Sequence, residues 1–322
     1  MKVVFHHEHP LPVIKYGGIE RIIYWHMIEL VRQGHQVTLI GHPESKVTEH
    51  GIDLIPIDMQ NKGDWEKLIP ADTSIVHLFY NHKVGKFPTI NTIQGNGKVG
   101  EVFNINSVFV SKKHAENHSS NQFIYNGLDL SEYPFIEKEK SWNQFLFLAK
   151  ASWSVKNLKH AVAACRACNK HLNIVGGRWI GISRFIHSMG MLGGKEKLDA
   201  IDKCDALIFP VRWHEPFGIA IIEAMALGLP VIGSPYGSLP EIINSDVGII
   251  VNNLDELKNV LRHPPRNFSA KKIRKYIESN FTIAIHTEKY LDKYNTILSG
   301  QTLNEKAPRF LSAVRAETLQ AF

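Results

Sequence analysis

Two glutamates, Glu215 and Glu223, stand eight positions apart on either side of a Pro-Phe-Gly turn. Ionised carboxylates only accept hydrogen bonds, so their partners are hydroxyl groups or cationic side chains. Glu223 lies among apolar residues, where an unpaired carboxylate is costly, and it needs a partner such as a ribose diol. Glu215 could accept hydrogen bonds from sugar hydroxyls. The alternative is that both are structural groups, one in a turn and one paired with a lysine or arginine.

The residues around these glutamates predict a strand, a turn and a helix. The apolar run ALIFPV, residues 206–211, is typical of a buried strand, and the apolar residues after the turn recur at helical spacing. In an open α/β sheet, ligands bind beyond the carboxyl ends of the strands, where this turn falls. Phe217, Gly218 and Ile219 would present backbone N–H groups at a helix N-terminus, which favours a phosphate group. Gly218 would let that ligand approach the backbone closely.

The spacing of the two glutamates, with Pro-Phe-Gly after the first and a Gly-x-Pro-Val strand after the second, resembles the retaining glycosyltransferases of family 4. Other similar segments are the first strand with its Gly17-Gly18 turn, FIYNGLDLSEY at 123–133 and FLFLAKASWSVKN at 145–157. The resemblance implies an α/β fold of GT-B architecture, in which two Rossmann-like doubly wound domains face a central cleft. It also implies a retaining, metal-independent hexosyltransferase.

In that family, the segment that matches 145–157 carries two cations that grip the donor pyrophosphate. This chain has Lys150 and Lys156 at suitable spacing, although a lysine lacks the bidentate fork of an arginine. The resemblance implies that both lysines assist departure of the diphosphate and that Glu215 orients the donor sugar.

The resemblance assigns the rest of the donor to three further residues. Glu223 would hold the ribose, and the backbone around Met191 and Leu192 would contact the base. No cofactor is expected beyond the donor itself, a UDP- or GDP-hexose.

Two glycines and a glutamine of the first domain complete the expected site. Gly17 and Gly18 would bring backbone close to the diphosphate or the acceptor. Many similar enzymes have His-Gly after the strand that corresponds to PTINTI, whereas this chain has Gln94 followed by glycine. Glutamine donates and accepts hydrogen bonds but cannot act as a general base. His77 and His82 are candidates for a polar role on the acceptor side, the alternative being ordinary buried or surface histidines.

These features predict transfer of a hexose to an acceptor hydroxyl on a glycan, a lipid-linked sugar or a small metabolite. The alternative is a catalytically weak nucleotide-sugar-binding module of the same fold, which Gln94 favours. A third interpretation, a nicotinamide-dependent oxidoreductase, rests on GNGKVG at 95–100, which matches the dinucleotide fingerprint. That match is weak because a loop and a strand, and no helix, are predicted after it.

Length, composition and cysteine content agree with a two-domain cytoplasmic protein. The 322 residues exceed one compact domain, and a hydrophobic content of 44% supports substantial cores. We found no secretory signal and no apolar run of about 18 residues that could span a membrane. Three cysteines fit a reducing compartment. At most, peripheral association with a membrane is expected.

The net charge of +6 is unevenly divided along the chain. Residues 1–140 contain 14 Lys+Arg and 16 Asp+Glu, whereas residues 141–322 contain 23 and 15. The basic half is the one expected to bind an anionic donor. No stripe of basic and aromatic residues or nucleic-acid-binding motif accompanies it, so nucleic acid is not an expected partner.

Strands alternate with helices in two series, which implies parallel sheets. The predicted domains are 1–135 for acceptor binding, 140–285 for nucleotide-sugar binding, and 286–322 for a helix that returns toward the first domain and a tail. The tail could be a short helix. Strands are expected near 2–6, 35–41, 52–57, 73–79, 88–93, 107–111, 145–150, 172–177, 206–211, 230–235 and 248–252. Helices are expected near 17–33, 157–169, 194–203, 218–228, 239–244, 254–262, 269–280 and 283–298.

Three other patterns receive structural interpretations. His6, His7 and His9 lack an accompanying carboxylate triad, and no metal site is predicted. The Cys-x-x-Cys that begins at Cys165 lies in an amphipathic helix, where that spacing places two small residues on one face. Ser238 with Glu241 is typical of a helix capping box.

Overall fold

The computed structural model describes residues 1–13, 17–139, 141–265, 268–311 and 322. The described chain forms two compact units. The first unit comprises residues 1–13, 17–129 and 282–311, and the second comprises residues 130–281, without the gaps just given, together with Phe322. No helix in these ranges is both long and apolar enough to cross a bilayer.

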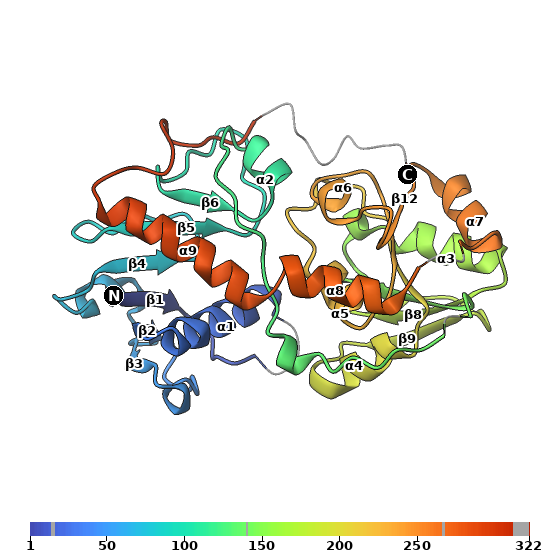
Figure 1. Ribbon diagram of the computed structural model, residues 1–322, viewed down its shortest axis with the longest axis horizontal. Coiled ribbons are helices and arrows are strands. Elements are labelled where there is room, and N and C mark those ends of the chain that lie inside the picture. The colour runs from blue at the N-terminus through green and yellow to red at the C-terminus, as the bar shows by residue number, and fades with distance from the viewer. Residues whose placement is uncertain (14–16, 140, 266–267, 312–321) are drawn as a thin grey trace. The chain divides into compact units, whose positions relative to one another are not determined.

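The described part of the first unit holds a six-stranded parallel sheet in the order β3-β2-β1-β4-β5-β6 (Figure 1). Its strands are β1 (Lys2–His7), β2 (Gln36–Gly41), β3 (Asp53–Pro56), β4 (Ile75–Leu78), β5 (Thr89–Ile93) and β6 (Ser107–Phe109). The unit's helices are α1 (Gly18–Arg32), α2 (Lys112–Glu116) and α9 (Ile283–Leu298), with 3-10 turns at Thr48–His50 and Lys62–Leu68. α9 packs against α1 and β5.

The second unit repeats this topology with a six-stranded sheet in the order β12-β11-β10-β7-β8-β9 among its described residues. The strands are β7 (Gln144–Leu148), β8 (His171–Val175), β9 (Ile186–Gly190), β10 (Ala206–Phe209), β11 (Val231–Gly233) and β12 (Gly248–Ile250). The helices are α3 (Leu158–Ala167), α4 (Gly194–Asp202), α5 (Ile219–Ala226), α6 (Leu239–Ile242), α7 (Leu254–Arg262) and α8 (Ala270–Asn280). Short 3-10 turns lie at Leu130–Glu132 and Ser154–Lys156.

Both sheets have the strand order of a doubly wound nucleotide-binding domain, with a switch point next to the first strand of each series. In the second unit that point lies between β7 and β10, which pair in parallel. The loops that follow these two strands carry Lys150 and Glu215 respectively. The predicted α/β fold is therefore confirmed, and it brings the two candidate loops to the edge where such sheets bind ligands.

Two elements and one cap differ from the sequence predictions. β9 was missed because it is an edge strand: only Ile186 is buried, so the segment lacks an apolar run. α2 was also missed, although Ser111 caps it by accepting from the backbone N–H of His114 at 3.1 Å. The predicted capping box at α6 is wrong, because the Ser238 hydroxyl donates instead to the Phe217 carbonyl at 2.7 Å. The tail segment 309–322, which could be a short helix, lies outside the described residues except for 309–311 and 322.

Several of the 11 histidines in residues 1–140 are buried between β-strands and helices. His26 of α1 is hydrogen-bonded to Thr287 at 2.8 Å and to Tyr294 at 2.9 Å. His77 of β4 is hydrogen-bonded to the same Tyr294 at 2.7 Å and to Thr92 at 2.7 Å. These contacts join α9 to the sheet and to α1. The polar role proposed for His77 on the acceptor side stays untested, whereas its contacts assign it a structural one.

The buried histidines predict that acid weakens the first unit. Burial lowers the pKa of His26 and His77, and lowers that of His286 to about 4. The histidines of the unfolded chain titrate near pH 6.5. Below that pH, the unfolded chain therefore binds more protons than the folded chain. The stabilisation from each such histidine should be fully present above about pH 7 and should be lost toward pH 5, with a slope that rises to about 1.4 kcal/mol per pH unit below pH 6.

Urea unfolding at a series of pH values measures this slope. The variant His77→Gln should have a slope smaller by up to about 1.4 kcal/mol per pH unit, whatever its stability at neutral pH. A free energy of unfolding that stays constant over this pH range would contradict the assignment.

Candidate functional site

The turn between β10 and α5 has the geometry of a phosphate site. Gly218 precedes α5 with a left-handed φ of 86°, and it has no side chain that could cap the helix. Ile219 is the first helical residue, and Phe217 is buried beneath the turn. The leading N–H groups of such a helix and its dipole favour an anion. These three residues therefore lie where the sequence placed them.

Glu215 lies on this turn and is bound to a cation. Its Oε2 atom lies 2.5 Å from the Lys156 ammonium and accepts a hydrogen bond from the Trp213 indole at 2.6 Å. The ammonium also lies 4.8 Å from the centre of the Trp213 ring and 5.4 Å from that of Phe209. Both charged side chains are about nine-tenths buried, with 11% and 8% exposed. The pair is thus held in a low-dielectric pocket of aromatic side chains, where the attraction between its two charges is stronger than in water.

The segment that carries Lys156 is fixed to the end of β10. Asn157 has a left-handed φ of 61° and donates from its side chain to the Pro210 carbonyl at 2.8 Å. The Arg212 N–H donates to the Val155 carbonyl at 2.7 Å. These bonds explain why a residue 59 positions away in sequence reaches Glu215.

Lys150 follows β7 on the same side and is exposed. Its ammonium lies 5.1 Å from the centre of the Trp153 ring, and Trp153 meets Trp213 edge to face at 6.3 Å. The structure therefore brings Lys150, Lys156 and Glu215 together around two tryptophans. Sequence reasoning gave these tryptophans no role.

Glu223 belongs to a second buried cluster, one turn into α5. Its Oε1 atom lies 2.6 Å from the Lys197 ammonium of α4 and accepts from the Tyr133 hydroxyl at 2.6 Å. The carboxylate is 4% exposed and the ammonium 8%. The pairing of Glu223 with Lys197 is the structural alternative that the sequence analysis gave for this glutamate. It provides the buried carboxylate with hydrogen bonds, and the carboxylate can still accept one from a further hydroxyl group. Lys197 could have been found from the sequence, because it shares a helix face with the buried Ala200 and Ile201.

Gly237, which the sequence analysis passed over, supports Glu215. It adopts a left-handed φ of 63°, and a Cβ there would lie 2.3 Å from both the N and O atoms of Glu215. The neighbouring Ser238 N–H donates to the Glu215 carbonyl at 3.0 Å. The loop after β11 therefore fits tightly against the loop after β10.

We expect Gly237→Ala to lower turnover by about a hundredfold, because displacing a site residue by about 1 Å has effects of that size. A left-handed alanine should also cost about 1–2 kcal/mol of stability. The matched control is Gly34→Ala, since Gly34 has a φ of 81° but nothing within 4 Å of its Cβ position. Steady-state kinetics of both variants separate the steric effect from backbone strain. Equal turnover in the two variants would refute the steric effect of Gly237 on Glu215.

The candidate site residues of the first unit lie at the start of α1 and in the loop after β5. Gly17, with a φ of 154°, precedes α1, and Gly18 begins that helix. The Gln94 and Asn126 amides form two hydrogen bonds of 3.0 Å with each other. The following loop is fixed by histidines: His114 is bonded to the Gly95 carbonyl at 3.0 Å, and the Gly97 N–H donates to His118 at 2.9 Å. Residues 95–100 lead into no helix, as predicted.

The remaining candidates are placed as follows. Met191 is exposed and Leu192 is half-buried in the turn between β9 and α4. His6 stacks on Trp65 at 4.2 Å and is hydrogen-bonded to Tyr80 at 2.7 Å, and burial lowers its pKa to about 4. His82 is paired with Glu66 at 2.7 Å. In the ranges that the structure describes, no group of three His, Cys, Asp or Glu side chains could hold a metal ion.

Comparisons with known proteins agree with this geometry. Residues 143–263 match the family model of the group 1 glycosyl transferases. Trehalose synthase of Pyrococcus horikoshii is 29% identical over 31% of this chain and 26% of its own length. Phosphatidyl-myo-inositol mannosyltransferase of Propionibacterium freudenreichii is 28% identical over 39% and 36%. The chain thus matches only about a quarter to a third of the length of these curated relatives.

Two solved structures extend the likeness in fold over most of the chain. The glycosyltransferase AviGT4, which is involved in avilamycin A biosynthesis, covers 93% of this chain and 99% of its own, with 23% identity and a TM-score of 0.77. Anabaena Alr3699/HepE, solved in complex with UDP, covers 92% and 100%, with 13% identity and a TM-score of 0.67. The β10–α5 turn with its lysines and glutamates falls inside residues 143–263, which are similar to the group 1 glycosyl transferases, and the chain has the GT-B fold.

Proposed function

We propose that this chain is a retaining glycosyltransferase that moves a hexose from a nucleotide diphosphate sugar to an acceptor hydroxyl. The observation that carries the proposal is the buried Lys156–Glu215 pair at the N-terminal end of α5, with Lys150 beside it. Two cations and a helix N-terminus can bind a diphosphate, and a carboxylate at the same place can accept hydrogen bonds from sugar hydroxyls.

The donor would be held by its diphosphate. The N–H groups of Phe217, Gly218 and Ile219 would bind phosphate oxygens, and the two lysines would neutralise the charge that develops as the glycosidic C–O bond breaks. Because Glu215 already holds Lys156 in place, little reorganisation accompanies bond cleavage. Preorganisation of this kind is the largest single source of catalysis in many enzymes.

The sugar and the nucleoside would be fixed at either end of the diphosphate. Glu215 would accept hydrogen bonds from sugar hydroxyls. Glu223, whose orientation Lys197 and Tyr133 fix, would accept from the ribose. The backbone at Met191 and Leu192 would contact the base. HepE has also been solved in complex with UDP-glucose, so a UDP-hexose is the first donor to test.

We further propose that the reaction retains anomeric configuration and needs no metal ion. The family resemblance supports attack on the same face from which the diphosphate leaves, without an enzymatic nucleophile. Lys150 and Lys156 supply positive charge that a divalent cation supplies in other transferases. Transfer should therefore continue in the presence of a chelator, and the anomeric proton signals of donor and product should report the same configuration.

The first unit is proposed to bind the acceptor. Gly17 and Gly18 would present backbone to the diphosphate or the acceptor, and the paired amides of Gln94 and Asn126 would offer hydrogen bonds to hydroxyls. The acceptor would be a glycan, a lipid-linked sugar or a small metabolite.

Thermal denaturation with UDP-, GDP- and ADP-hexoses, and with NAD as a control, tests the proposal. A ligand at a hundred times its dissociation constant adds about 2.7 kcal/mol of stability, so one nucleotide sugar should raise the melting temperature measurably. Transfer to a panel of acceptors is then measured with that donor. Stabilisation without turnover on any acceptor would favour the binding module, and stabilisation by NAD alone would refute both.

A further inference from the structure

Two isoleucine side chains in the loop between β8 and β9, residues 177–185, are almost fully exposed to solvent. Ile180 is 96% exposed and Ile182 is 99% exposed, so neither side chain contacts the body of the unit appreciably. The next most exposed large hydrophobic residue among those described is Ile136, at 69%. Single exposed apolar residues are ordinary, but two almost fully exposed ones at one loop tip mark an interaction surface.

The loop is built to hold the two isoleucines outward. Gly181 lies between them with a φ of 157°, and a Cβ there would lie 2.4 Å from the Trp179 ring. The Trp179 ring packs partly against the core of the second unit, and its backbone N–H donates to the Ser188 hydroxyl at 3.0 Å. The backbone therefore bends closely over an anchored tryptophan.

Three exposed arginines surround this tip. Arg178 and Arg184 flank it in the loop, and Arg166 reaches toward it from the end of α3. The Arg166 guanidinium lies 5.9 Å from the Trp179 ring centre, and that of Arg184 lies 4.8 Å from the Phe185 ring centre. No ion pair joins any of the three to another described residue. The sequence from 140 to 195 contains no Asp or Glu, so no carboxylate of this segment offsets the three arginines.

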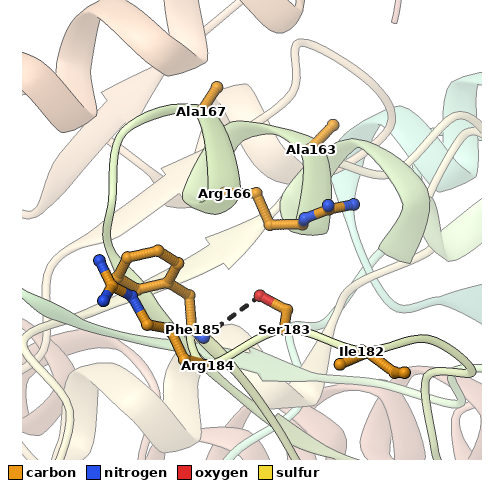
Figure 2. Close-up of a pocket in the computed structure, with 7 residues that line it drawn as sticks. All are labelled: Ala163, Arg166, Ala167, Ile182, Ser183, Arg184 and Phe185. Carbon is orange, nitrogen blue, oxygen red and sulfur yellow. Dashed lines mark hydrogen bonds between the residues drawn. The ribbon is translucent and has the colours of Figure 1, made fainter.

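A pocket of about 530 Å³ lies between the loop and α3. Figure 2 shows Arg166 on α3, across the pocket from the segment that carries Ile182, Ser183 and Arg184. Arginine binds phosphate in bidentate fashion, so the arginines at this pocket suit an anionic headgroup. The pocket opens beside the apolar tip.

We propose that this loop docks on a membrane surface that contains anionic phospholipids. Ile180 and Ile182 enter the boundary of the acyl chains, while the arginines bind lipid phosphates. The combination of apolar side chains on one side and arginines behind them is that of interfacial membrane anchors. Nucleic acid would use the cations but not the aliphatic tip, and a stable protein partner would need about 800 Å² on this side. The proposal is independent of the donor site.

Flotation of the 322-residue chain with lipid vesicles tests this inference. Wild type should bind phosphatidylcholine vesicles that contain about one-third phosphatidylglycerol, and bind them far better than vesicles of phosphatidylcholine alone. Each of Arg178→Gln and Arg184→Gln should lower the partition coefficient about fivefold, and added salt should lower it further.

The apolar contribution is tested by Ile180→Ser with Ile182→Ser. This double variant should lose binding to anionic vesicles, while Ile136→Ser, an exposed isoleucine in the same unit, should bind as wild type does. All variants should keep the wild-type melting temperature, since these side chains contact little. Equal binding to neutral and anionic vesicles, or undiminished binding by the double isoleucine variant, would overturn the proposal.

Discussion

Replacing Lys156 with methionine is expected to lower turnover by about two to three orders of magnitude, the loss seen when one preorganised group that stabilises developing charge is removed. The ammonium is buried at 2.5 Å from Glu215. Its removal takes charge from the departing diphosphate and frees the carboxylate that orients the sugar. Both effects act on the transition state, so kcat should fall more than the affinity for the donor.

Steady-state kinetics with the donor identified by thermal denaturation measure this effect. Lys159→Met is the matched control, because Lys159 is an exposed lysine three residues further on, and it should behave as wild type. Unfolding experiments on both variants separate lost chemistry from lost structure. Turnover by Lys156→Met within about threefold of wild type would remove this residue from the mechanism.

Breaking the Glu223–Lys197 pair should have the largest effect on stability. Removing one partner of a buried ion pair leaves the other charge without compensation, and such changes cost about 3–5 kcal/mol. Glu223→Met should lower the free energy of unfolding by that amount and abolish donor binding as well. Lys197→Met should destabilise the chain to a similar extent while retaining the carboxylate.

The double variant Glu223→Met with Lys197→Met distinguishes stability from function. Two apolar side chains of similar volume often replace a buried pair at little cost, so its stability should recover most of the loss. Donor binding should not recover, because the ribose would still lack its acceptor. If urea unfolding shows a loss below about 1 kcal/mol for Glu223→Met, the pair contributes little to stability.

The sequence predicted the parts of the site that depend on local pattern. The run at 206–211, the Pro-Phe-Gly turn and the helix after it appear as β10, the Gly218 cap and α5, because periodicity and glycine conformation are local properties. The helices predicted at 254–262 and 283–298 have those bounds in the structure. The parallel sheets followed from the alternation of strands and helices, whereas the order of the strands was not predicted.

Contacts between segments that are distant in the chain could not be predicted from the sequence. Glu215 meets Lys156 from 59 positions away, and Glu223 meets Tyr133 from 90. Gly237 resembles any turn glycine until its closeness to the Glu215 backbone is known. The sequence did not explain the histidines of the first half, because it does not show which of them have a hydroxyl partner such as Tyr294 in the fold.

Isothermal titration of the 322-residue chain with UDP and GDP tests most directly whether the lysines and the start of α5 bind the donor diphosphate. One of the two should bind wild type and Lys159→Met equally. The double variant Lys150→Met with Lys156→Met should bind it at least about a hundredfold more weakly, because two hydrogen bonds to charged groups are lost. Unchanged affinity in the double variant would contradict the account, as would heat from NAD and none from any nucleoside diphosphate.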